Sequence, residues 1–103
     1  MDQQDVDRVA LTDGTLTTLV GGRSQLRILV HQLVGSNAGA SLSTVDIKED
    51  VTTKFSLAMA ANGGGFSLEL RRPWRLPEGA SLKVQQSASV ASYISTIWEF
   101  EPA

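Results

Sequence analysis

A series of about eight short runs, in which apolar side chains recur at every second position, constrains the fold of this chain more than any other feature. The clearest run is 54–61, where Phe55, Leu57 and Met59 alternate with lysine, serine and alanine. Successive side chains of a β-strand point to opposite faces, so a period of two predicts a strand with one buried face. Turn residues separate the runs at intervals of roughly 8–12 residues, and no helical stripe is present, which indicates an all-β sandwich or barrel.

The turns that join these runs follow from the residues between them. Asp13 and Gly14 form a dipeptide typical of a hairpin turn, and the glycine-rich segment 62–65 predicts a second hairpin. We expect a loop over 35–39 and a solvated, charged turn over 48–50. A jelly roll and an immunoglobulin-like Greek key satisfy the same alternation; we favour a single antiparallel, jelly-roll-like sandwich. The expected strands cover residues 9–12, 15–20, 26–34, 42–47, 54–61, 66–70, 81–87 and 92–100.

Length and composition favour a single small domain. The 103 residues suit one β-sandwich over 9–103, and the polar segment 1–8 with its three aspartates predicts a flexible acidic N-terminal arm. The net charge of −2 offers no positive field for nucleic acid. The longest apolar run, Ile28 to Val34, is too short to cross a bilayer, and the acidic start is unlike a secretory signal. The sequence has no cysteine. We therefore expect a soluble protein that has no disulfides and binds neither nucleic acid nor a membrane.

The run 26–34 is apolar on both of its faces. With strict alternation one face carries Leu29, His31 and Leu33. The other face then carries Leu26, Ile28, Val30 and Val34. A sandwich buries only one face of a strand against its core, so the face of Leu29, His31 and Leu33 indicates a covering loop, an arm or another subunit.

A connection with two prolines follows the run 66–70. Pro73 and Pro77 cannot donate to a β-ladder, so residues 72–79 predict an ordered corner between two strands. Trp74 lies in this corner beside Arg72, and with Tyr93 it could offer a stacking platform for a sugar. The structural alternative, which we favour, is that Trp74 closes an open end of the sandwich while the arginines pair with acidic side chains.

No set of residues with a recognisable catalytic pattern is present. His31 is the only histidine, and its apolar neighbours favour a packed or subunit-facing role over catalysis. Asp46, Glu49 and Asp50 form the densest carboxylate cluster, but their spacing lacks the regular donors of a calcium loop and favours a solvated turn. The segment 62–65 lacks the lysine and hydroxyl residue of a phosphate-binding loop. We therefore expect a protein that is not an enzyme and has no metal or cofactor.

The order of several features resembles a known group of proteins. These features are the start at Asp13 to Thr15, the strand 26–30, the segment 72–82 with its Leu76-Pro77-Glu78-Gly79 turn, and the closing strand 93–101. In this order they are similar to the small β-sandwich accessory proteins of tailed bacteriophage virions. In that group a proline–glycine turn feeds the penultimate strand, and an aromatic and an acidic residue end the last one.

The resemblance implies a non-enzymatic structural protein of a virion, assembled in the host cytoplasm. The role that it favours is capsid decoration of the cement type, by a homo-oligomer, preferably a trimer, bound to the major capsid protein. The alternatives are a neck, tail or fibre component, or a carbohydrate- or surface-binding module. The short acidic N-terminus departs from the family in offering no long capsid-clamping arm. The candidate interface residues are Leu29, His31, Leu33, Trp74, Arg72 and Tyr93.

Overall fold

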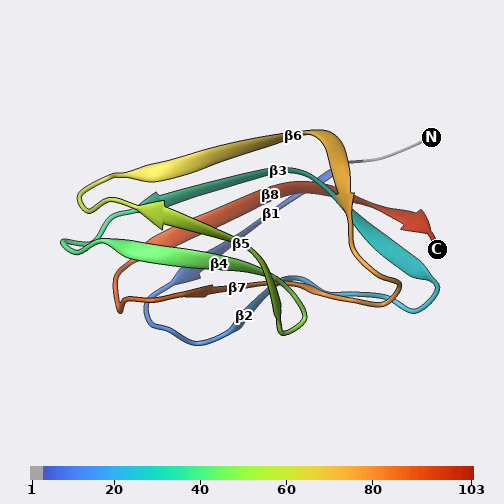
Figure 1. The fold of residues 1–103 in the computed structure, drawn as a ribbon, viewed down its shortest axis with the longest axis horizontal. Coiled ribbons are helices and arrows are strands. Elements are labelled where there is room, and N and C mark those ends of the chain that lie inside the picture. Colours follow the sequence, from blue (N-terminus) through green and yellow to red (C-terminus); the bar gives the residue numbers. More distant parts are fainter. Residues whose placement is uncertain (1–3) are drawn as a thin grey trace.

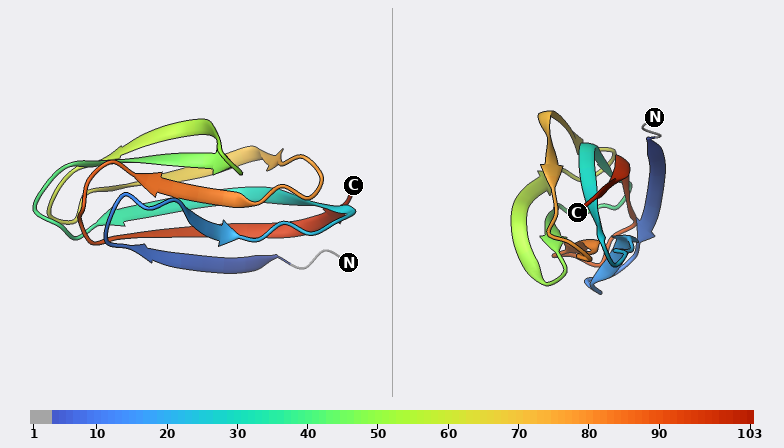
Figure 2. Two further views of the ribbon diagram at one scale, coloured as in Figure 1. Left: turned by 90° about the horizontal axis from the view of Figure 1, so that it is seen from below. Right: turned by 90° about the vertical axis from the view of Figure 1, so that its right-hand side faces the viewer.

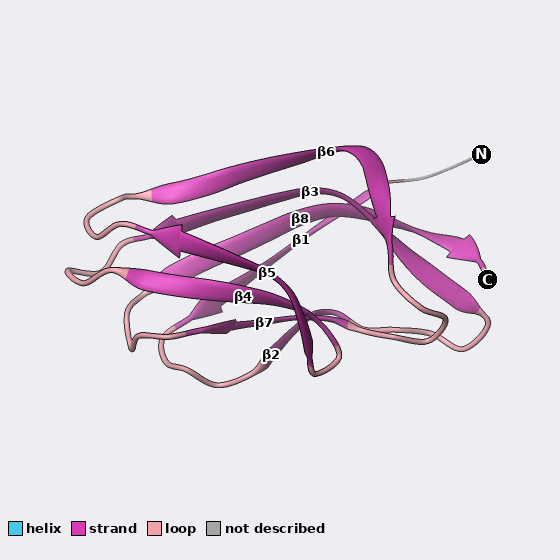
Figure 3. Ribbon diagram, in the orientation of Figure 1, coloured by secondary structure: helices cyan, strands magenta, loops and turns pink. Residues whose placement is uncertain are grey.

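The computed structural model describes residues 4–103, which form strands and no helix (Figure 1, Figure 3). Among these residues there is accordingly no helix long and apolar enough to cross a membrane. The strands are β1 (Asp5–Leu11), β2 (Thr17–Val20), β3 (Leu26–Asn37), β4 (Ser43–Glu49), β5 (Thr52–Met59), β6 (Gly65–Arg75), β7 (Leu82–Gln86) and β8 (Ser92–Pro102).

The strands form two antiparallel sheets of four, with the orders β1-β8-β3-β6 and β2-β7-β4-β5. Figure 2 shows the strands running along the long axis of the molecule in two layers. Most consecutive strands lie in different sheets, which is the connectivity of a jelly roll and not of an immunoglobulin fold. The expected all-β, jelly-roll-like sandwich of about eight strands is therefore confirmed.

Both hairpins expected from glycine-containing turns are absent. The turn at Asp13 and Gly14 joins β1 to β2, and the segment 62–65 joins β5 to β6, but each pair of strands is divided between the two sheets. Only β4 and β5 are consecutive and hydrogen-bonded to each other. A dipeptide that tolerates a tight turn reverses the chain equally well within a sheet and between sheets, so it does not identify the pairing partner.

The core lies between the sheets and is made by alternate residues of the central strands. In β4, β7 and β8 the buried positions recur with a period of two, as the alternation predicted. The fully buried side chains with the largest volumes include Ile28, Leu33, Ile47, Met59, Leu76, Leu82 and Ile94. Burial of this apolar surface provides the main driving force for folding, at roughly 25 cal/mol per Å².

Two buried amides hold the connections at one end of the sandwich. The Asn37 amide nitrogen donates to the carbonyl oxygens of Ser41 and Met59, at 2.8 and 3.1 Å. The Gln86 amide nitrogen donates to the Val90 carbonyl at 2.8 Å. Because these side chains are buried with partners, they supply hydrogen bonds that the loop backbones would otherwise lack.

Three strands differ from expectation by more than two residues at one end. β1 begins at Asp5, so residues 5–8 belong to the sheet and not to the arm predicted over 1–8; residues 1–3 of that arm lie outside the described residues. β3 continues to Asn37, into the loop expected over 35–39, and β6 continues through Pro73 to Arg75. β1 and β6 are edge strands, where short polar segments and prolines are tolerated because one side of the backbone needs no strand partner.

Candidate interaction surface

A β-bulge at His31 decides which side chains of β3 point outward. Val30 pairs with Trp98 and Gln32 pairs with Ile97, so His31 is an extra residue between two regular pairs. Beyond the bulge the alternation is offset by one position, and Leu33 faces the core with no exposed surface. The expected face of Leu29, His31 and Leu33 is therefore wrong, since an extra residue in one strand moves the later side chains to the opposite face.

The outward side chains of the β1-β8-β3-β6 sheet, which we call the outer face, form rows across the four strands. One row joins Val6 to Ile97 and Gln32 to Glu69 across neighbouring strands, with Ile97 opposite Gln32. The adjacent row consists of Arg8, Ser95, Val34 and Ser67. Three hollows follow one another along this face and share lining residues.

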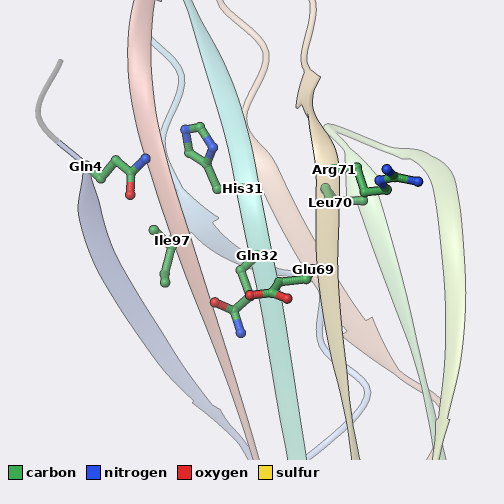
Figure 4. Close-up of a pocket in the computed structure, with 7 residues that line it drawn as sticks. All are labelled: Gln4, His31, Gln32, Glu69, Leu70, Arg71 and Ile97. Atoms are coloured by element: carbon green, nitrogen blue, oxygen red, sulfur yellow. The ribbon is translucent and has the colours of Figure 1, made fainter.

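The hollow at the His31 end is lined by both polar and apolar side chains and has a volume of about 400 Å³ (Figure 4). Gln4, His31, Gln32 and Glu69 contribute polar groups from two strands and the residue preceding β1. Figure 4 shows the Glu69 carboxylate beside the Gln32 side chain, whereas the Arg71 guanidinium points to the other side of β6. The hollow thus presents the Glu69 carboxylate, which forms no ion pair within residues 4–103.

The middle hollow is the most apolar of the three and has a volume of about 300 Å³. Val6, Val34 and Ile97 line it. Val6 is 68% exposed and Val34 is 38% exposed, although both lie within regular strands. Exposed apolar side chains that cluster around a hollow are typical of surfaces that contact another molecule.

The third hollow is the smallest, about 180 Å³, and its charge comes from Arg8. The guanidinium carbon of Arg8 lies 4.5 Å from the centroid of the Tyr93 ring, a cation–π contact. Tyr93 is outward, as its candidate interface role requires, but Arg8 covers its ring. The outer face therefore has a cationic end and an end with a carboxylate, separated by apolar side chains.

His31 contacts Glu99 beside the hollow at the His31 end. The His31 Nε2 atom lies 3.1 Å from Glu99 Oε1, and Glu99 is only 7% exposed. The second carboxylate oxygen of Glu99 is buried and has no hydrogen-bond partner among residues 4–103. Leu29 is outward and buried, and it pairs with Glu99 on one side and Arg75 on the other. His31 thus secures the bulge to β8, and no nucleophile is bonded to it within the described chain.

The three carboxylates of the 46–50 cluster serve separate local contacts. Asp46 accepts a hydrogen bond from the Ser56 hydroxyl at 2.7 Å, and Asp50 accepts one from the Ser81 backbone N–H at 3.0 Å. Glu49 accepts a hydrogen bond from a tryptophan at 3.1 Å and lies 3.6 Å from a lysine ammonium. Within residues 4–103 no group of three or more potential ligands could hold a metal ion.

Trp74 is partly buried and packs against the other sheet. Its ring meets Phe55 edge to face at a centroid distance of 5.2 Å, and its indole N–H donates to Glu49. Nearby, the Arg75 guanidinium bonds Glu101 at 3.0 Å. Arg72 is exposed and lies apart from the three hollows. These contacts match the structural interpretation of the corner more closely than a sugar platform.

The outward face of the β2-β7-β4-β5 sheet is different in character. Its outward positions carry small or polar side chains: Thr18, Thr44, Asp46, Lys48, Ser56, Ala58, Lys83 and Gln85. Lys48 and Gln85 are hydrogen-bonded to each other across this face at 2.9 Å. Such a surface is typical of contact with water, so the apolar character of the outer face is not general to the molecule.

Sequence reasoning missed Val6, Val34, Ile97, Arg8 and Glu69 as surface candidates. Val6 stands between two aspartates in the sequence, and its place on the surface becomes apparent only through the pairing of β1 with β8. Strict alternation places Val34 with the core-facing residues, because the bulge at residue 31 has no sequence signal of its own.

No protein-family model matches the sequence, and no curated protein sequence matches it. Solved structures nevertheless share its fold. A chain in the acid-stable capsid of Helicobacter pylori bacteriophage KHP30 has a TM-score of 0.60 at 11% identity, covering 100% of this chain and 95% of that chain. A chain in the virus-like particle of Macrobrachium rosenbergii extra small virus, from the giant freshwater prawn, has a TM-score of 0.55 at 8% identity, covering 96% and 78%.

A third similar structure belongs to a different kind of assembly. A chain of the disulfide-linked pili of Bacillus endospore appendages has a TM-score of 0.52 at 13% identity and covers 99% of this chain and 90% of that chain. At these identities the similarity concerns the fold alone. The chain thus shares its jelly-roll fold with chains of two viral particles and one bacterial pilus.

Proposed function

We propose that this protein is a non-enzymatic structural component of a virus particle. The observation that carries the proposal is the apolar hollow on the outer face, where Val6 and Val34 are exposed within strands of the sheet. A domain that uses one sheet face for contact and the other for water suits a subunit of an assembly. The jelly-roll fold shared with chains of viral particles supports the same role.

The more specific role that we propose is capsid decoration of the cement type. The resemblance in the order of features to accessory proteins of tailed-phage virions supports it, and so does the small size of a chain built as one sandwich. In this role the protein self-associates and binds the major capsid protein. The resemblance implies a trimer, whereas the outer face suits a dimer, and a measurement of the mass in solution decides between the two.

A carbohydrate-binding role is less well supported by the two aromatic side chains that suggested it. The Trp74 ring packs on Phe55, and the Tyr93 ring is covered by Arg8. Both rings are therefore already engaged in contacts within the domain, which leaves less of each ring for a sugar to stack on. We favour the structural role for this reason.

Mass spectrometry of density-gradient-purified particles of the encoding virus tests the proposal. The expected result is a copy number comparable to that of the major capsid protein, together with rebinding of the purified protein to particles that lack it. Absence from purified particles and failure to rebind would overturn the virion role. Rebinding at the neck, tail or fibres, seen by electron microscopy, would retain the virion role and overturn decoration.

A further inference from the structure

We infer that two copies of this chain contact each other through their outer faces. A two-fold axis relates the copies; it lies in the plane of the contact and passes over β8 and β3. This inference rests on the proposed role as a self-associating structural protein and names the surface that performs it. A two-fold contact is isologous, so the same patch must be complementary to itself. The outer face meets this requirement in its apolar residues, its charges and its size.

The apolar residues lie where such an axis would pass. Ile97 and Gln32 are directly opposite each other on β8 and β3, and Ser95 and Val34 are opposite each other in the next row. An axis that crosses these strands diagonally, passing over Ile97 on β8 and Val34 on β3, places Ile97 against Ile97 and Val34 against Val34 of the second copy. Ile97 and Val34 would then be covered by their own equivalents, and Val6, on the edge strand β1, would lie to one side of the axis.

The charges at the two ends are complementary under the same operation. Arg8 lies on β1 and Glu69 lies on β6, the two edge strands, in adjacent rows on opposite sides of the axis. Within residues 4–103 neither forms an ion pair. The two-fold operation places Arg8 of each copy across from Glu69 of the other. Two such pairs would flank the apolar centre as a polar rim.

The outer face is also large enough for a stable contact. β3 has 12 residues, and four strands spaced ~4.8 Å apart at ~3.3 Å per residue make a face of roughly 40 by 19 Å. This is on the order of the ~800 Å² that each partner contributes to a standard interface. The face of the other sheet, with its polar outward residues, provides no comparable apolar centre.

A charge-swap experiment tests this arrangement with the full chain. Sedimentation velocity from low to high micromolar concentration should show the wild-type protein in a monomer–dimer equilibrium. Arg8→Glu and Glu69→Arg should each weaken association by about 10-fold or more, because each places like charges opposite each other. The double variant should recover most of the affinity. Val34→Lys should abolish association because it places a charge in the apolar centre.

Lys83→Glu is the matched control, since it reverses a charge on the outward face of the other sheet and should leave association unchanged. Circular dichroism and thermal unfolding should show that every variant is folded.

A wild-type monomer at all concentrations, a trimer by mass, or single charge reversals that the double variant does not rescue would each overturn the inference. If the dimer forms but the protein is missing from particles, the virion role fails and the interface stands. If the protein is a monomer but is present on particles, the interface fails and the virion role stands.

Discussion

Leu33→Ala is the sharpest test of the bulge at His31, because the bulge alone decides whether Leu33 or Val34 is buried. Leu33 has no exposed surface and lies in the central cluster of the core. Truncating a fully buried leucine removes its transfer energy and leaves a cavity, at a cost of ~3 kcal/mol within the usual range of about 2–5. With a urea m-value of ~1–3 kcal/mol/M, the unfolding midpoint should fall by roughly 1–3 M.

Val34→Ala is the matched control, since without the bulge the two residues would exchange places. Val34 is outward, so its truncation should cost less than ~1 kcal/mol in the monomer. Tryptophan fluorescence during urea unfolding, at two protein concentrations, separates core from interface: the Leu33→Ala effect should be independent of concentration, whereas that of Val34→Ala should grow with it. A larger loss for Val34→Ala than for Leu33→Ala in dilute protein would refute the register.

Three further changes test local features. Gly35→Ala would place a Cβ atom 2.2 Å from the Phe66 ring and should lower the free energy of unfolding by ~1–3 kcal/mol, measured by thermal unfolding. Gly21→Ala is the control and should be close to neutral, because no heavy atom lies within 4 Å of its Cβ. Equal effects of the two substitutions would contradict the close approach at Gly35. Trp74→Ala should cost ~3 kcal/mol in denaturant unfolding, and Trp74→Phe about 1, because the ring packing is retained; a loss below ~1 for alanine would mean that the ring is not structural. The pKa of the Asp13 carboxyl is lowered by the hydrogen bond from the Thr15 backbone N–H, so its stabilising effect is present above the ordinary pKa and is lost as the pH falls through the lowered one. An NMR titration should place the Asp13 midpoint below that of free aspartate, and Asp13→Asn should remove this acid-range dependence; a midpoint at or above the free value would refute it.

The strands of this fold were predictable from local patterns, and their pairing was not. The period of two predicted strands over 54–61 and 92–100, and each end of these runs lies within two residues of the corresponding end of β5 or β8. The hairpins failed because a turn at Asp13 and Gly14 constrains only the local path of the backbone. Which sheet the next strand joins is decided by burial across the sandwich, which involves residues far apart in sequence.

The surface was less predictable for the same reason. The outer face combines Val6, Ile97 and Glu69 from three strands, and the rows exist only because β1 and β6 lie at the edges of one sheet. The structural contact of Trp74 could be predicted because its aromatic ring and the neighbouring prolines are local signals. The face of Leu29, His31 and Leu33 was wrong because one unpaired residue, without a glycine or proline to mark it, reverses the alternation.

The bulge also has a consequence for how the gene can change. β3 is a regular strand with one additional residue, His31, opposite an irregular stretch of β6. The gene therefore carries one additional codon at that position. Deleting that codon would leave Ile28, Val30 and Leu33 pointing inward, with only the link to Glu99 lost. Deleting the codon for Leu29 instead, with the ladder closing regularly, would turn His31 inward and Val30 outward. The central strand can therefore shorten by one codon at the bulge while keeping its buried side chains, a freedom that its other half lacks.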